Sequence, residues 1–190
     1  MFERYKFPLK HVWKIASKPD ETLSYEALLN TFYGKNILRQ YVMPLAEILF
    51  VAGFIRFSLF ANQGVATAVV KSIFDYFSFV VSYGVLFYLV RLVSTRFFKF
   101  QCEDRNVSLM VVSLMSVSFV VKLLLSVMPN MFFVNFFYVY IFYLVWVMSE
   151  GVIDVPEEQR NKYMVAISFL VIVVPMVIMM VLKKIVVPNL

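Results

Sequence analysis

Five long apolar segments follow one another along the chain after residue 40. They cover about 41–60, 73–94, 107–128, 131–149 and 163–182, and none shows the strict alternation of a β-strand. Each is close to the roughly 20 residues that a helix needs to cross the hydrocarbon core of a bilayer. The pattern predicts an all-α integral membrane protein with five transmembrane helices. The Pro129-Asn130 turn should join the third and fourth as a tight hairpin.

Residues 1–40 form the only sizeable polar region of the chain. They hold seven of the 18 lysines and arginines. Trp13 lies between Lys10 and Lys14 within an apolar stretch, a pattern that is typical of a short amphipathic helix in the membrane interface. Such a helix would place the Trp13 ring at the level of the lipid headgroups.

A second short amphipathic helix is predicted between Pro19, which suits the first position of a helix, and Gly34, which suits its end. Its apolar stripe consists of Tyr25, Leu28, Leu29 and Phe32. The candidate interfacial or partner-binding residues of the region are therefore Trp13, Tyr25, Leu28 and Phe32. The alternative is that the stripe packs against the membrane domain of the same chain.

The composition excludes an ordinary soluble domain. Hydrophobic residues make up 62% of the chain and charged residues 16%, whereas about 25% of a typical soluble domain is charged. The net charge of +6 indicates lysines and arginines beside cytosolic helix ends, facing anionic lipid, and not a nucleic-acid partner.

The distribution of basic residues orients the predicted helices. It places residues 1–40 and the linkers near 95–106 and 150–162 in the cytosol. Lys183 and Lys184 are the exception, because five spans put the C-terminus on the opposite side.

Five charged residues fall inside the apolar segments, although a lysine at the centre of a membrane helix costs roughly 2.5–3.5 kcal/mol. Their depths predict two layers. In the inner layer Glu47 pairs with Arg91, and in the outer layer Arg56 and Lys122 gather around Asp75. The first four spans should form the core because they hold these charges, whereas the uncharged fifth span should lie at the lipid-facing rim.

Two other interpretations of these charges remain open. The side chains of Arg56, Lys71 and Arg91 are close enough to helix ends to reach the headgroups alone. Alternatively, the charges line a transport pathway, for which the serines of the second and third spans give only weak support because serines commonly bind neighbouring helices.

Residues for enzyme chemistry are not visible. The chain has one histidine, His11, and one cysteine, Cys102, and it has no phosphate-binding loop or serine-nucleophile motif. We therefore expect no enzymatic activity, no cofactor and no bound metal.

The stretch from Val12 to Leu23, VWKIASKPDETL, followed by QYVMPLAEI at 40–48, resembles the opening of the Yip-domain family of membrane proteins. The features that carry the resemblance are Trp13, Lys18-Pro19, Thr22 and Pro44. The family consists of five-span proteins named for eukaryotic members that bind Rab/Ypt GTPases, and the match is to its bacterial-type members. The resemblance implies a five-helix bundle in the bacterial cytoplasmic membrane with a cytosolic N-terminus. The short signatures of the eukaryotic members are not visible, so GTPase binding is not implied.

These observations lead to two hypotheses about function. The first is a non-enzymatic scaffold or complex subunit that acts in membrane organisation through lipids, other membrane proteins or a second copy of itself. The alternative is a small transporter or channel for an ion or a lipid that uses the intramembrane charges.

Overall fold

The computed structural model describes residues 3–61, 64–100, 102–128 and 132–186. Within these ranges the protein is entirely helical. Five helical segments are long and apolar enough to cross a membrane: Leu38–Phe60, Val65–Phe97, Asp104–Val127, Val134–Gly151 and Glu157–Leu182. The prediction of five such helices is confirmed, whereas the Pro129-Asn130 turn lies outside the described residues.

Several of these segments, called candidate spans below, combine an α-helix with a short turn of another helical type. The elements are η1 (Leu38–Val42), α4 (Met43–Ile55), η2 (Arg56–Phe60), α5 (Val65–Leu92), η3 (Val93–Phe97), α6 (Asp104–Val127), η4 (Phe132–Tyr138), α7 (Val139–Gly151) and α8 (Glu157–Val186). The turns η1, η2 and η3 are π-helical and η4 is a 3-10 helix. α8 remains helical through Pro175.

The second candidate span begins earlier than predicted. Residues 65–71 are the first two turns of α5 and not part of a linker. Lys71, which precedes the predicted segment at 73–94, therefore lies within α5. Its Nζ is 5.6 Å from the centroid of the Phe57 ring on η2. Gly64, with an extended backbone, precedes the first turn.

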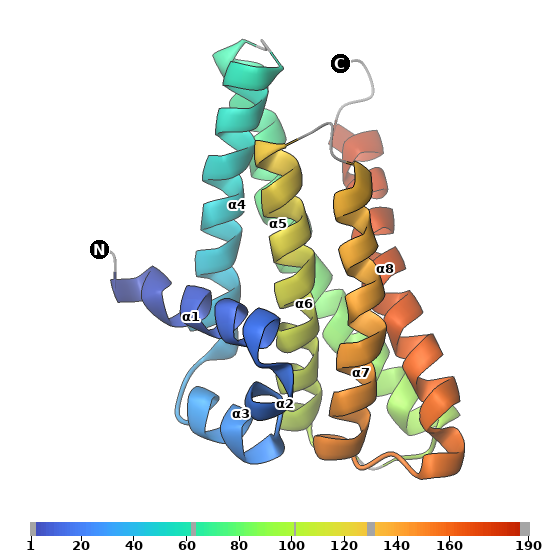
Figure 1. Ribbon diagram of the computed structural model, residues 1–190. Coiled ribbons are helices and arrows are strands. Elements are labelled where there is room, and N and C mark those ends of the chain that lie inside the picture. The colour runs from blue at the N-terminus through green and yellow to red at the C-terminus, as the bar shows by residue number, and fades with distance from the viewer. Residues whose placement is uncertain (1–2, 62–63, 101, 129–131, 187–190) are drawn as a thin grey trace.

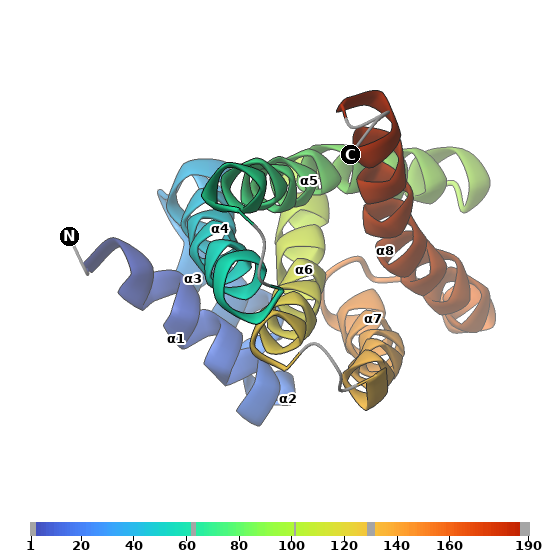
Figure 2. The same ribbon diagram turned by 90° about the horizontal axis from the view of Figure 1, so that it is seen from above.

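α6 is the centre of the bundle. Figure 2 shows it between α4 and α5 on one side and α7 and α8 on the other. In its most apolar window 72% of the residues are buried, compared with 28% to 33% in the other four candidate spans. The first four candidate spans all contribute buried residues to one core cluster, as expected, and α6 fills its centre. The fifth span also contributes to this core through Tyr163, Ile167 and Val171, and its buried share of 28% is close to the 33% of three other spans, so its position at the rim stays a prediction.

Three short helices precede the bundle: α1 (Glu3–Ser17), α2 (Pro19–Thr22) and α3 (Tyr25–Phe32). α1 lies across the long helices, and α2 and α3 fold back beneath it (Figure 1). The second predicted helix is thus two helices, because Ser24 interrupts it and accepts a hydrogen bond from the backbone of Ala27 at 3.4 Å. Gly34 follows α3 with a φ of 65°, as expected for a residue that ends a helix.

Hydroxyl pairs connect the helices inside the bundle. Tyr41 and Ser116 lie 2.7 Å apart between η1 and α6, and Tyr83 and Ser108 lie 2.6 Å apart between α5 and α6. A third pair joins η3 to α8, with Ser94 and Tyr163 at 3.0 Å. These three hydroxyl pairs therefore serve helix packing.

Candidate functional site

A charged cavity lies between the long helices. Arg56, Asp75 and Lys122 all line it, and its volume is about 190 Å³. The predicted outer layer of charges is therefore one site, to which η2, α5 and α6 contribute one charged side chain each. Ser126 and Tyr138 add two hydroxyl groups. The remaining lining residues are apolar: Leu49, Leu125, Pro175, Met176 and Met179.

Lys122 is the deepest of the three charges. Its Nζ is buried and has no hydrogen-bond partner among the described residues. The Nζ lies 5.9 Å from the centroid of the Phe79 ring. A free ammonium group would be costly in such surroundings, and its electrostatic interaction with Asp75 offsets part of that cost.

Asp75 is held where α4 and α5 approach each other closely. Gly53 permits this approach, because a Cβ at position 53 would lie 3.1 Å from Asp75 Oδ2 and 3.4 Å from Ser72 Oγ. The Ser72 hydroxyl donates to the carbonyl of Ala68 at 2.7 Å. Gly53 thus fixes how far the carboxylate can move toward α4.

Arg56 contributes the second cation of the cavity. Its guanidinium lies 5.3 Å from the centroid of the Phe57 ring, the same ring that Lys71 approaches. Lys71 does not line the cavity. The site therefore contains two cations and one carboxylate, and this excess of positive charge in an apolar wall favours an anion.

The predicted inner layer is wrong. Glu47 accepts hydrogen bonds from Arg4 Nη2 and from the Tyr5 hydroxyl, each at 2.8 Å. Arg91 pairs with Asp104 at the start of α6, at 3.1 Å. The reason is the course of α5, which begins beside α4 and runs obliquely past α8 (Figure 2). Its last turns therefore lie far from the start of α4, while α1 brings its own arginine to Glu47.

The predicted partner-binding residues of the N-terminal region lie in different environments. Leu28 and Phe32 are buried in the core of the same chain, and Tyr25 is half-buried against that core. The apolar stripe therefore packs on the membrane domain, which is the alternative interpretation. Trp13, in contrast, is 73% exposed.

His11 is a buried residue whose position the sequence interpretation missed. Its ring packs edge-on against Phe32 at 5.0 Å and Tyr41 at 5.4 Å between centroids, and neither ring nitrogen has a hydrogen-bond partner among the described residues. Burial, assisted by the charges of Lys14 and Lys35, lowers the pKa of His11 to about 4. The spacing of Phe7, His11 and Ile15 along α1 was the signal for this buried face.

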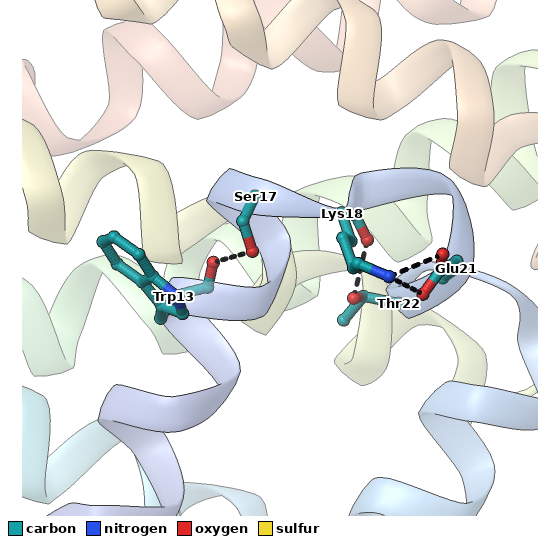
Figure 3. A network of polar contacts seen from close by, with 5 residues as sticks. All are labelled: Trp13, Ser17, Lys18, Glu21 and Thr22. Carbon is teal, nitrogen blue, oxygen red and sulfur yellow. Dashed lines mark hydrogen bonds and ion pairs between the residues drawn. The ribbon is translucent and has the colours of Figure 1, made fainter.

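The residues of the Lys18-Pro19 motif form a compact corner between α1 and α2 (Figure 3). Ser17 donates to the carbonyl of Trp13 at 2.9 Å, and Thr22 donates to the carbonyl of Lys18 at 2.7 Å. The Lys18 ammonium lies 3.0 Å from both carboxylate oxygens of Glu21. The threonine of the motif therefore stabilises the last turn before the chain bends toward α3.

No protein-family model, curated protein or solved structure matches this chain. The fold and the cavity define its class as a helical protein with five potential membrane spans. Among the described residues, no group of three or more His, Cys, Asp or Glu side chains is placed to hold a metal ion.

Proposed function

We propose that the chain is a non-enzymatic, multi-pass membrane protein that binds a small anion, or the anionic headgroup of a lipid, in the charged cavity. It would belong to the class of small ion or lipid transporters. The observation that supports this proposal is the buried Nζ of Lys122, which has no hydrogen-bond partner among the described residues, in a cavity that Arg56 also lines. An anion in the cavity would supply the charge and the hydrogen bonds that Lys122 lacks.

The size of the cavity is compatible with such a ligand. Its volume of about 190 Å³ is an order of magnitude above the ~10–15 Å³ that one water requires. The serines beyond the cavity favour a binding site over an open pore, because Ser113 and Ser82 each donate to the carbonyl four residues earlier.

The substitution Lys122→Met tests this function. Wild-type protein should gain thermal stability with inorganic phosphate, chloride or a short-chain phosphatidate, and should carry the bound ion across liposomes of neutral lipid. Lys122→Met should abolish both effects while the protein still elutes as a folded species, because methionine preserves most of the side-chain volume.

Lys71→Met is the matched control. It removes a cation from the neighbouring turn that does not line the cavity, so the anion effects should persist. If wild-type protein responds to none of these anions, or if both variants respond equally, the proposed function is wrong.

A scaffold or complex subunit is the second candidate, favoured by exposed aromatic residues outside the candidate spans. Trp13 and Tyr33 are 73% and 76% exposed. Such side chains are enriched in protein interfaces. In this role the chain would act as the Yip-domain resemblance implies, in a bacterial cytoplasmic membrane with its N-terminus in the cytosol.

Purification in mild detergent tests the second candidate. Wild-type protein should retain a stoichiometric membrane-protein partner or form an oligomer, and Trp13→Ala combined with Tyr33→Ala should release it. A monomer that carries an anion and retains no partner would leave only the first candidate.

A further inference from the structure

A basic groove lies where α1 meets the start of the first candidate span. It has a volume of about 740 Å³, and Arg4, Lys35 and Arg39 contribute its cations. Met43, the first residue of α4, forms part of the same wall. The groove therefore straddles the point at which the chain changes from polar sequence to membrane-spanning sequence, which is the level of lipid headgroups.

The cations of this groove are only partly neutralised. Lys35 and Arg39 form no ion pair with any described residue, whereas Arg4 shares its charge with Glu47. The one carboxylate of the groove, Glu3, lies 3.5 Å from Lys6. The groove thus presents a net positive charge to an approaching ligand.

Lys35 is held in place before any ligand arrives. Its Nζ lies 3.5 Å from the centroid of the Phe7 ring and donates to the carbonyl of Thr31 at 2.6 Å. An ammonium group has two further donors. A pre-positioned cation loses little rotamer entropy when it binds an anion.

An apolar groove adjoins the basic one. It has a volume of about 410 Å³ and lies between α4 and α5, with Val51 and Phe77 exposed along it. Arg4 lines the basic groove and Glu47 lines the apolar one, so their 2.8 Å ion pair marks the boundary between the two. From Arg39 to Val51 the helix rises roughly 18 Å at about 1.5 Å per residue, close to the roughly 15 Å of hydrocarbon in one leaflet.

We propose that the two grooves bind one anionic glycerophospholipid, with its phosphate at Arg4, Lys35 and Arg39 and one acyl chain along Val51 and Phe77. The ligand is a lipid and not free phosphate because the apolar groove continues from the basic one into the membrane-spanning part of the helix. The cations of Lys35 and Arg39, which form no ion pair with any described residue, favour an anionic lipid over a neutral one. This site is separate from the charged cavity.

The test is binding of phosphatidylglycerol to the purified full-length protein in neutral detergent, followed by native mass spectrometry. Wild-type protein should bind dioleoyl-phosphatidylglycerol and not dioleoyl-phosphatidylcholine. Lys35→Gln combined with Arg39→Gln should weaken this binding about thirtyfold, as expected for two interfacial charges.

Three controls make the result specific. Lys10→Gln combined with Lys14→Gln removes the same charge from exposed positions on α1 and should change binding less than threefold. The charge-preserving pair Lys35→Arg and Arg39→Lys should retain most of the affinity. Lys122→Met should leave phosphatidylglycerol binding unchanged, which separates this site from the proposed function.

Three outcomes would overturn the proposal. The first is an equal loss of binding in the two glutamine pairs, which would mean diffuse attraction to a basic surface. The second is equal binding of the neutral and anionic lipids. The third is full competition by soluble glycerophosphoglycerol, which would mean a site for the free anion alone.

Discussion

Gly53 is the residue on which the geometry of the charged cavity depends most directly. A Cβ there would lie 3.1 Å from Asp75 Oδ2, so the carboxylate would have to move by a few tenths of an ångström. We expect Gly53→Ala to lower the free energy of unfolding in mixed micelles by about 1–3 kcal/mol, the usual cost of overpacking, and to weaken anion binding.

Gly84→Ala is the matched control, because nothing lies within 4 Å of the Cβ that it would add. Alanine stabilises a helix by roughly 0.5–1 kcal/mol relative to glycine, so this variant should be as stable as wild type or more so. Equal stability of the two alanine variants would show that the contact between Gly53 and Asp75 does not limit the approach of α4 and α5.

His11 should make the stability of the N-terminal region depend on pH. Its pKa falls from 6.5 to about 4 on folding because the ring is buried beside Lys14 and Lys35. The native state keeps the ring neutral, so its full contribution to stability is present above pH 6.5 and is lost as the pH falls toward 4. By linkage the loss at pH 5 is about 2 kcal/mol.

Thermal unfolding in detergent at pH 7.5 and pH 5.0 measures this effect. The control is His11→Phe, which keeps an aromatic ring between Phe32 and Tyr41 and removes the titration. The midpoint of the wild type should fall more than that of the variant. The same fall in both proteins would place the pH dependence elsewhere.

The charges show what sequence alone could predict at the scale of residues. The position of a residue along a predicted span gives its depth in the membrane. Similar depths grouped Arg56, Asp75 and Lys122, which line one cavity in the structure. Depth alone predicted an ion pair between Glu47 and Arg91 that does not form, because an ion pair also requires the two helices to lie side by side. Depth carries no information about lateral position, or about α1, which supplies Arg4 to Glu47 from outside the bundle.

At the scale of elements, the contact between η1 and α6 depends on one buried hydroxyl pair. Tyr41 and Ser116 are 2.7 Å apart, and both are buried. Tyr41→Phe and Ser116→Ala each remove one hydroxyl, and a double-mutant cycle isolates their interaction. We expect a coupling of about 0.6 kcal/mol, the average for such pairs between membrane helices.

The coupling is obtained from the free energies of unfolding, in mixed micelles, of the wild type, the two single variants and the double variant. The pair Tyr83→Phe and Ser108→Ala offers a second cycle with a similar hydroxyl separation of 2.6 Å, between α5 and α6. Fully additive effects of Tyr41→Phe and Ser116→Ala would contradict the assigned bond.

The elements themselves were predictable from apolar runs, but their ends were less so. The apolar run at 73–94 underestimates the length of α5 because it excludes Lys71, whereas in the structure the helix extends back to Val65 and the Nζ of Lys71 lies 5.6 Å from the centroid of the Phe57 ring. The prediction bounds the second short helix by Pro19 and Gly34 and gives no break at Ser24, which in the structure accepts a hydrogen bond from the backbone of Ala27 at the start of α3. The sequence could not show whether the apolar stripe of α3 binds a partner or packs within the chain. The burial of Leu28 and Phe32 in the core shows that it packs within the chain.

At the scale of the whole molecule, a crossing of the membrane by α8 has a direct consequence for topology. The start of α8 and the C-terminus should lie on opposite sides of the membrane. With Cys102 replaced by serine, single cysteines at Glu157 and Asn189 should therefore differ in their reaction with a membrane-impermeant thiol reagent in intact cells. The orientation that we propose has Asn189→Cys labelled from outside and Glu157→Cys labelled only after lysis.

Disruption of the cells before labelling is the control for both positions, since each cysteine should then react. Labelling of both positions only after lysis would mean that α8 does not cross, and it would remove the conflict between Lys183, Lys184 and the positive-inside tendency. The reverse pattern would retain five spans and reverse the proposed orientation.

The central place of α6 also bears on how the protein is made. α6 is the third candidate span to leave the ribosome, yet it packs against α7 and α8, which are synthesised later. Until those two helices arrive, part of its surface, including Lys122, must be sheltered by the insertion machinery or by lipid. A chain that stops after α6 would expose this unfinished surface and become a substrate for membrane quality control, so the last helix completes the biogenesis of the whole bundle.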